Sequence, residues 1–420
     1  MTYQLSTLQN GLRVASEHLP GMESIAIAMS VDVGARHEEE AEGGLSHLLE
    51  HMAFKGTSTR SARDIAESFD AIGGQFNAYT SLEHTVYYAK VLKEHLPLAV
   101  DILSDILLHS VFDPQELKRE QGVVLQEIAS HFDAPDDLIF DLLDRTAFPD
   151  QPLGRSILST PERIMSHTRE ALVTYMEKHY AAPRMVLSAA GNVKHEMLLD
   201  LAERYLAPLS PGVPRPPVVP GRYVGGDDRE ADDLEQLHLL LGLPALSAHD
   251  DDYYALQLYS SILGGGMSSR LFQEIREKRG LAYHVSSMTA AYADCGMMNV
   301  YCATGENEAA ELPMLLADEI KRMAGGVTEA ELSRVRNQQK AELLMARENP
   351  GRVAGWIGRH LLVFERYKPL KEIIANIEAV THDDMRRVGA LLLEGMPTLA
   401  ALGPIGKLPP HEAVAGRLLA

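Results

Sequence analysis

The sequence predicts an α+β protein of two homologous domains, each a mostly antiparallel sheet with helices packed on one face. One observation is the length of 420 residues with 45% hydrophobic content, which allows more than one packed core. Another is a break at 208–228, where proline and glycine crowd together and periodicity disappears. The same order of elements recurs on both sides of this break. We therefore expect a domain at 1–207, a linker at 208–228 and a second domain at 229–420.

Hydrophobic periodicity in the first half predicts a strand, two helices, two strands and two more helices. The last helix has a clear start, because Asp113 suits the cap, Pro114 suits the first position and Glu116 completes a capping-box-like pattern. The expected elements are a strand at 24–33, a helix around 47–51, a helix from 61 to the Gly73-Gly74 pair, strands at 75–81 and 84–92, and helices near 95–108 and 114–130.

The second half repeats this order, but its first helix lacks the histidine and glutamate residues that the first half carries at 47–51. A capping box from Thr328 to Glu331 opens its last helix, and a Gly264-Gly265-Gly266 turn follows its first helix. The expected elements are a strand near 236–243, helices at 250–263 and from the glycine turn to Gly280, strands near 282–291 and 296–303, and helices near 307–324 and 328–347.

The segment His47-Leu48-Leu49-Glu50-His51 sets two imidazoles four residues apart with a carboxylate between them. On a helix, residues four apart lie on one face, so both rings can bind one ion, and Glu50 shares that face with His47. Zinc held by three ligands lowers the pKa of its water to roughly 7, and a nearby carboxylate can take the proton. The pattern predicts a zinc hydrolase, although the pentapeptide alone is only moderately specific.

The third ligand is expected to be an acidic residue on another helix. Glu120 and Glu127 are seven residues apart in the helix predicted near 114–130, so they point to one side. They flank the apolar run Val123-Val124-Leu125, which indicates that this side is packed. Without the histidine pair, either carboxylate would be read as an ordinary solvated group.

With these motifs the chain resembles the pitrilysin or insulinase metallopeptidases, the inverzincins, in their short mitochondrial-processing-peptidase-like branch. The resemblance rests on "GGLSHLLEHMAFKGT" and on "EQGVVLQEI", which places Glu127 76 residues after His51, and it covers nearly the whole chain. It implies one zinc per chain, bound by His47, His51 and Glu127, with Glu50 acting on water. It also implies that Glu120 supports the ligands from behind.

The resemblance further implies two substrate-binding features. Arg276 and Tyr283 are seven apart in "SSRLFQEIREKRGLAYHVSS". By resemblance, Tyr283 would bind the developing oxyanion or scissile carbonyl, and Arg276 would orient peptide carbonyls. The stretch Asn77-Ala78-Tyr79-Thr80 would be an edge strand onto which an extended peptide adds. The alternatives are a helix-face arginine with a core tyrosine, and an ordinary hairpin strand.

Composition narrows the classes of partner and location. The net charge of −20 argues against nucleic acid and is compatible with basic peptides, although it could simply maintain solubility. Because no apolar run approaches the ~18 residues that cross a bilayer and the start lacks a signal-peptide layout, we expect no membrane insertion and a cytoplasmic location. The two cysteines, Cys295 and Cys302, do not suggest a disulfide framework or a thiolate zinc site.

Together these observations predict a zinc endopeptidase that cuts extended or unfolded peptides inside a closed chamber. The resemblance implies a homodimer in which Arg276 and Tyr283 of one chain serve the zinc of the other. Whether this pair acts within its own chain or across the dimer stays open, as do the natural substrate and the biological role. The competing hypotheses are a structural subunit, a subunit that needs a different partner chain, and a peptide-binding chaperone that holds zinc.

Overall fold

The computed structural model describes residues 2–213, 215 and 217–420, and the chain folds as two units built from separate stretches of sequence. The first unit comprises 1–129, 156–218 and 344–368, and the second comprises 130–155, 219–343 and 369–420. Of the predicted linker, Pro214 and Pro216 lie outside the described residues; its other residues before β7 form no helix or strand. Each unit is built from three stretches of sequence, whereas the predicted domains are continuous. The boundaries at 207 and 229 stay a prediction.

The first unit contains a six-stranded sheet in the order β1-β2-β6-β3-β5-β4. Its pairings are antiparallel except for β2 with β6, as the mostly antiparallel prediction requires. The strands are β1 Thr2–Thr7, β2 Arg13–His18, β3 Ser24–Val31, β4 Gln75–Thr80, β5 Thr85–Leu92 and β6 Met185–Gly191. The helices of this unit are α1 Leu45–Ala53, α2 Ala62–Asp70, α3 Leu96–Leu108, α4 Pro114–Phe132, α6 Pro161–Ser166, α7 Arg169–His179, α8 His195–Leu206 and α12 Pro350–Phe364.

The second unit contains a five-stranded sheet in the order β7-β11-β8-β10-β9, where only β7 and β11 pair in parallel. Its strands are β7 Gly226–Ala231, β8 Leu237–Ala245, β9 Ala282–Ala291, β10 Gly296–Thr304 and β11 Thr398–Gly403. Its helices are α5 Pro135–Ala147, α9 Tyr253–Gly264, α10 Leu312–Ala324, α11 Glu329–Ala346, α13 Leu370–Ala379, α14 His382–Leu392 and α15 His411–Leu419. The two α+β sheets confirm the predicted fold class.

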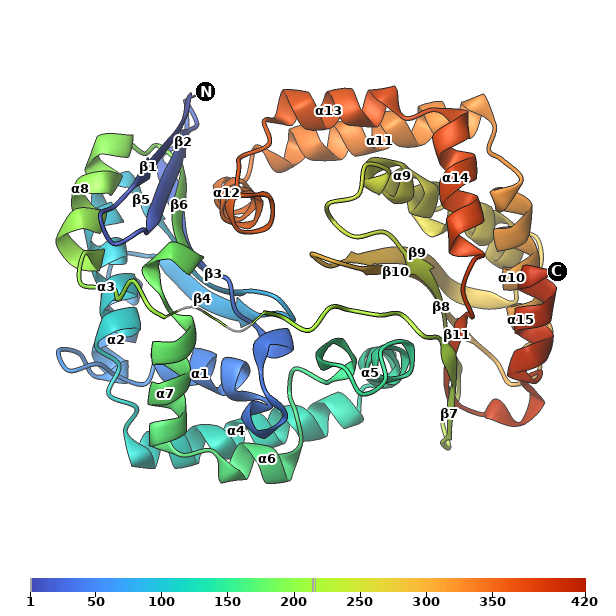
Figure 1. Ribbon diagram of the computed structural model, residues 1–420, viewed down its shortest axis with the longest axis horizontal. Helices are drawn as coiled ribbons and strands as arrows, with labels where there is room; N and C mark the ends of the chain where they lie inside the picture. The colour runs from blue at the N-terminus through green and yellow to red at the C-terminus, as the bar shows by residue number, and fades with distance from the viewer. Residues whose placement is uncertain (1, 214, 216) are drawn as a thin grey trace. The chain divides into compact units, whose positions relative to one another are not determined.

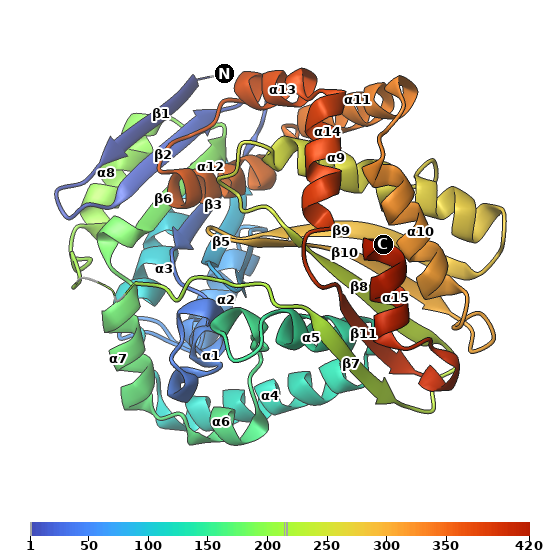
Figure 2. The ribbon, with the colours of Figure 1, turned by 45° about the vertical axis from the view of Figure 1, so that its right-hand side comes forward.

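Each sheet is also covered on its second face, by a helix from the other half of the sequence. In the first unit α12 packs on β2, β3 and β6 (Figure 1), and in the second unit α5 packs on β7, β8 and β11 (Figure 2). The predicted arrangement had helices on one face only. The reason for the difference is visible in β3, whose alternate residues Ala26 and Ala28 are as buried as Ile25 and Ile27. A strand that is apolar on both faces must be covered on both.

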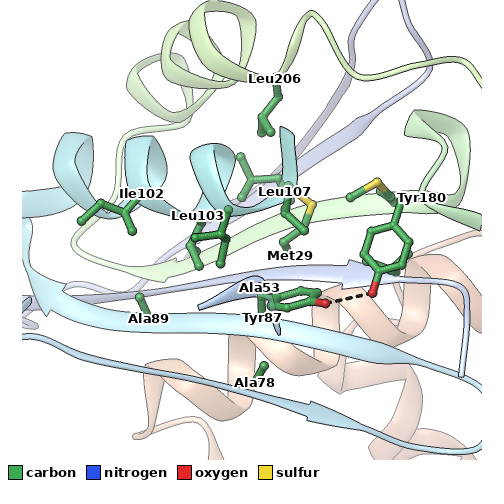
Figure 3. Packing of buried hydrophobic residues seen from close by; sticks show 14 of the residues in the cluster. Met29, Ala53, Ala78, Tyr87, Ala89, Ile102, Leu103, Leu107, Tyr180 and Leu206 are labelled. Atoms are coloured by element: carbon green, nitrogen blue, oxygen red, sulfur yellow. Dashed lines mark hydrogen bonds between the residues drawn. The ribbon is translucent and has the colours of Figure 1, made fainter. Parts of the chain in front are cut away.

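The main core of the first unit lies between its sheet and α3. Figure 3 shows Leu103 and Leu107 of α3 above the strands, with Met29 and Tyr87 below them. The hydroxyls of Tyr87 and Tyr180 are 2.9 Å apart, so the polar end of each buried ring has a hydrogen-bond partner. This core fixes β5, and β5 in turn fixes the neighbouring edge strand β4.

Several predicted details are confirmed and one differs. Thr328 and Glu331 form the predicted capping box through reciprocal bonds between side chains and backbone. The segment before Gly280 differs, because Phe272–Glu277 is a π-helix, in which the Lys278 amide donates to the Gln273 carbonyl five residues back. Cys302 is buried, Cys295 is half-buried, and no disulfide joins them. None of the described helices has the length together with the apolar character that spanning a bilayer requires.

Candidate metal centre

The helix α1 begins at a cap that comes from outside the helix. The Glu38 carboxylate accepts hydrogen bonds from the amides of Gly44, at 2.9 Å, and Ser46, at 2.7 Å. These amides would otherwise be unpaired donors at a helix start, where a negative charge is also favoured. Gly44 has φ +84°, a conformation that favours glycine, and a Cβ there would lie 2.5 Å from the end of the Ile164 side chain, which would have to shift. Glu38 was not predicted from the sequence, because it belongs to no recognised cap spacing.

One face of α1 is apolar and buried, and the other carries the polar motif. The buried face fixes the rotation of the helix, so the motif must point away from the core. The buried residues are Leu45, Ser46, Leu48, Leu49, Met52 and Ala53. The ring centroids of His47 and His51 are 4.6 Å apart on the opposite side. The four-residue spacing therefore brings the two imidazoles together as predicted.

The helix α4 brings a carboxylate, the third potential ligand, to this pair. Glu127 Oε2 lies 3.6 Å from His47 Nε2 and 3.4 Å from His51 Nε2. One ligand atom from each of the three residues lies within 4.8 Å of the others, and among the described residues this is the one group of three or more potential ligands so arranged. The Glu127 side chain is 42% exposed, so solvent can reach the cluster.

The chemistry of the cluster fits zinc. Two imidazole nitrogens and one carboxylate oxygen are a common zinc donor set that leaves a coordination position open. Burial, together with a smaller effect of the neighbouring His51, lowers the pKa of His47 to about 4. His47 is therefore neutral near pH 7, which is the protonation state that binds a metal.

Glu50 lies beside the cluster and is held by the edge strand. The Thr80 hydroxyl, at the end of β4, donates to Glu50 Oε2 at 2.5 Å. Burial raises the pKa of Glu50, while the Thr80 hydrogen bond acts in the opposite direction. The contact between Thr80 and Glu50 was not predicted from the sequence, because the two residues lie thirty positions apart and no local spacing connects them.

Glu120 lies next to His51, and its role in supporting the ligands stays a prediction. Its carboxylate is 7% exposed, and Oε2 lies 3.1 Å from His51 Nδ1, the ring nitrogen that faces away from Glu127. A hydrogen bond at Nδ1 fixes the tautomer and leaves Nε2 available. Lys55 contacts the other Glu120 oxygen at 2.7 Å, and the sequence analysis did not identify it.

The predicted substrate strand is an edge strand. β4 pairs only with β5, so its other side has no strand partner among the described residues. Tyr79 is 50% exposed, whereas Ala78 is 8% exposed and faces the core. The Asn77 side chain accepts a hydrogen bond from the Ala78 amide at 2.9 Å, which satisfies one edge donor in the absence of a paired strand.

Arg276 and Tyr283 lie together in the second unit. The Arg276 guanidinium carbon is 4.4 Å from the Tyr283 ring centroid and 4.8 Å from that of Phe272. The π-helix carries Arg276, and β9 carries Tyr283. Tyr283 is 76% exposed, so it is not the core tyrosine of the alternative interpretation.

Behind α1, a buried histidine predicts acid sensitivity. His179 is 1% exposed, neither ring nitrogen has a hydrogen-bond partner, and its ring packs 4.4 Å from Tyr175, whose hydroxyl contacts Ser46 of α1. Burial lowers its pKa to about 3, and Lys178, Arg215 and Arg184 add to the effect. The unfolded chain, with a pKa near 6.5, therefore takes up the proton first as pH falls.

We expect the free energy of unfolding to fall by about 1.4 kcal/mol per pH unit below about 6.5 because of His179. The contribution is fully present above pH 6.5 and is lost as pH falls toward 3. His179→Phe should therefore lose less stability than the wild type between pH 7.5 and pH 5, as measured by urea unfolding. An identical loss in both proteins would show that this histidine does not titrate on unfolding.

Two family models match successive parts of the chain. A family model described as insulinase, peptidase family M16, matches residues 13–161, and one described as the peptidase M16 inactive domain matches 166–339. A protein of Rickettsia felis named an uncharacterized zinc protease is 41% identical over 96% of this chain and 98% of its own length. The uncharacterized zinc protease YmxG of Bacillus subtilis is 39% identical with the same coverage.

Two solved structures share the fold. A protease from Helicobacter pylori has a TM-score of 0.89 and 22% identity, covering 96% of this chain and 99% of its own. A peptidase M16 inactive domain from Pseudomonas fluorescens has a TM-score of 0.90 and 19% identity, covering 98% of this chain and 100% of its own. At these identities the likeness concerns the fold alone.

Proposed function

The chain belongs to peptidase family M16 and is a zinc metallopeptidase, and we propose that His47, His51 and Glu127 bind one zinc ion per chain. The observation that carries the proposal is the convergence of these three ligand atoms within 4.8 Å. It is supported by the neutral state of His47 and by the exposure of Glu127. In this proposal the second unit, whose residues 219–339 fall within the match to the inactive-domain model, contributes to substrate binding.

Bound zinc would acidify water and polarise the carbonyl under attack. Glu50 is the proposed general base, because it lies on the same face of α1 as His47 and its carboxylate is held in place by a hydrogen bond. The Thr80 hydroxyl holds Oε2, which leaves Oε1 to take the proton of the attacking water and pass it to the leaving amine. His51 is held in the tautomer that presents Nε2 by the carboxylate of Glu120.

Extended peptides are the proposed substrates. The open edge of β4 offers backbone donors and acceptors to an added strand, and such pairing needs an extended chain but little sequence identity. Arg276 would orient peptide carbonyls, and Tyr283 would donate its hydroxyl to the oxygen that gains negative charge. The net charge of −20 would favour basic peptides by long-range attraction.

Cleavage of one peptide sequence, either free or within a folded carrier protein, tests the substrate class. A quenched basic peptide of about 10 to 20 residues should be cut by the zinc-loaded protein. The same sequence within a stably folded carrier should stay intact, and unfolding the carrier should restore cleavage. Equal cleavage of the folded and unfolded carriers would contradict a closed chamber that admits only extended chains.

A homodimer with shared sites is the proposed assembly, and mixing two inactive variants tests it. One chain carries Glu50→Gln, and the other carries Arg276→Ala with Tyr283→Phe. If the pair acts across the dimer, random mixing should restore about a quarter of the wild-type activity, because half of the dimers are mixed and each has one complete site. If the mixture forms mixed dimers but stays inactive, sharing across the interface is wrong.

A further inference from the structure

Lys55 is linked to the His51 ring through a single carboxylate. Its Nζ lies 2.7 Å from Glu120 Oε1, and the other oxygen of Glu120 lies 3.1 Å from His51 Nδ1. Because the two oxygens belong to one rigid planar group, a contact that holds one oxygen sets the direction of the other. Glu120 is 7% exposed, so water has little access to replace either contact.

The turn that carries Lys55 is itself fixed. The Lys55 amide donates to the Met52 carbonyl at 3.1 Å, which ties the residue to the end of α1. Gly56 has φ +117°, a conformation that side chains disfavour, and it lets the chain reverse directly after Lys55. Beyond it, Thr57 donates to the buried carboxylate of Asp105 at 2.7 Å. The ammonium group of Lys55 therefore extends from an anchored backbone.

The two histidines differ in how they are oriented. His51 has Glu120 at Nδ1, whereas the Nδ1 atom of His47 is buried and has no hydrogen-bond partner. Within the described residues, the contact with Glu120 is therefore the one hydrogen bond that fixes a ring of the cluster through Nδ1. Any residue that holds Glu120 therefore contributes to the orientation of the His51 ring.

From these contacts we infer that Lys55 is a positioning residue for the metal centre. By holding Glu120 Oε1, it keeps Oε2 directed at His51 Nδ1 and so keeps His51 Nε2 facing Glu127, 3.4 Å away. The inference rests on the proposed function, since it needs His51 as a ligand. An ordinary surface ion pair in the same place would contribute to stability without affecting the metal.

Zinc affinity of the metal-free protein, measured by competition with a chromophoric chelator, tests this role without peptide cleavage. Lys55→Met should weaken zinc binding by about tenfold, the lower end of the range for partners that orient a ligand. Lys55→Arg should restore most of the affinity, since it keeps a cationic donor. Lys118→Met is the matched control, because it removes an equal charge from an exposed position of α4.

Two further results separate positioning from folding. Metal-free Lys55→Met should stay folded, with native circular dichroism and a single cooperative melt, although loss of the contact with the buried Glu120 carboxylate lowers its melting temperature, and adding Lys55→Met to Glu120→Gln should not weaken zinc further, because Lys55 acts through Glu120. Unchanged affinity in Lys55→Met, or additive losses in the double variant, would overturn the inference. If His51→Gln left zinc binding unchanged, the proposed function would fail instead.

Discussion

Glu50→Gln is expected to lower peptide cleavage by about a thousandfold, within the range of about 10² to 10⁴ that a positioned general base supplies. The amide has nearly the same shape and can still accept the Thr80 hydrogen bond, so the local structure should persist. Zinc content should also persist, because Glu50 is not among the three converging ligands. The measurement is the cleavage rate of a quenched peptide alongside the zinc content of the same sample.

The control for this variant is Glu94→Gln, which changes an exposed glutamate in the turn Lys93–His95. It should cleave at the wild-type rate. If zinc-loaded Glu50→Gln retained more than about a tenth of wild-type activity, a loss too small for a general base, another group would have to be the base.

His51→Gln has the second large expected effect, a loss of zinc affinity by more than about a hundredfold. Partners that only orient a ligand contribute about 10 to 100-fold, and removing the ligand should cost more. His51 also occupies a central place, since it contacts Glu127 through one nitrogen and Glu120 through the other. Affinity can be measured by chelator competition, and cleavage should fall in parallel when zinc is limiting.

His95→Gln serves as the control for histidine loss, because His95 lies in the short turn before α3 and belongs to no described ligand group. Its zinc affinity should equal that of the wild type. Tight zinc binding by His51→Gln would place the metal elsewhere and would remove the basis for the roles given to Glu120 and Lys55.

The motif was predictable because its geometry is local. A four-residue spacing on a helix is enough to place His47, Glu50 and His51 on one face, and a seven-residue spacing aligns Glu120 with Glu127. That α4 would lie against α1 came from resemblance to a family and not from spacing. The fold class was also predictable, since strand and helix periodicities repeat in the two halves.

The supporting contacts were not predictable from the sequence for a common reason. Thr80 reaches Glu50, Glu120 reaches Lys55, and Glu38 caps α1 through tertiary contacts that leave no periodic signal. The packing of α12 and α5 was missed similarly, because an amphipathic pattern shows that a helix is buried and does not show against which sheet.

The most direct test of the central claim is a zinc titration of the metal-free protein, with peptide cleavage and bound zinc measured together. The account predicts that activity is absent without zinc, rises in proportion to bound zinc, and reaches its maximum at one zinc per chain. Full cleavage by protein that chelation has freed of zinc would contradict it, as would a maximum that requires a second zinc per chain.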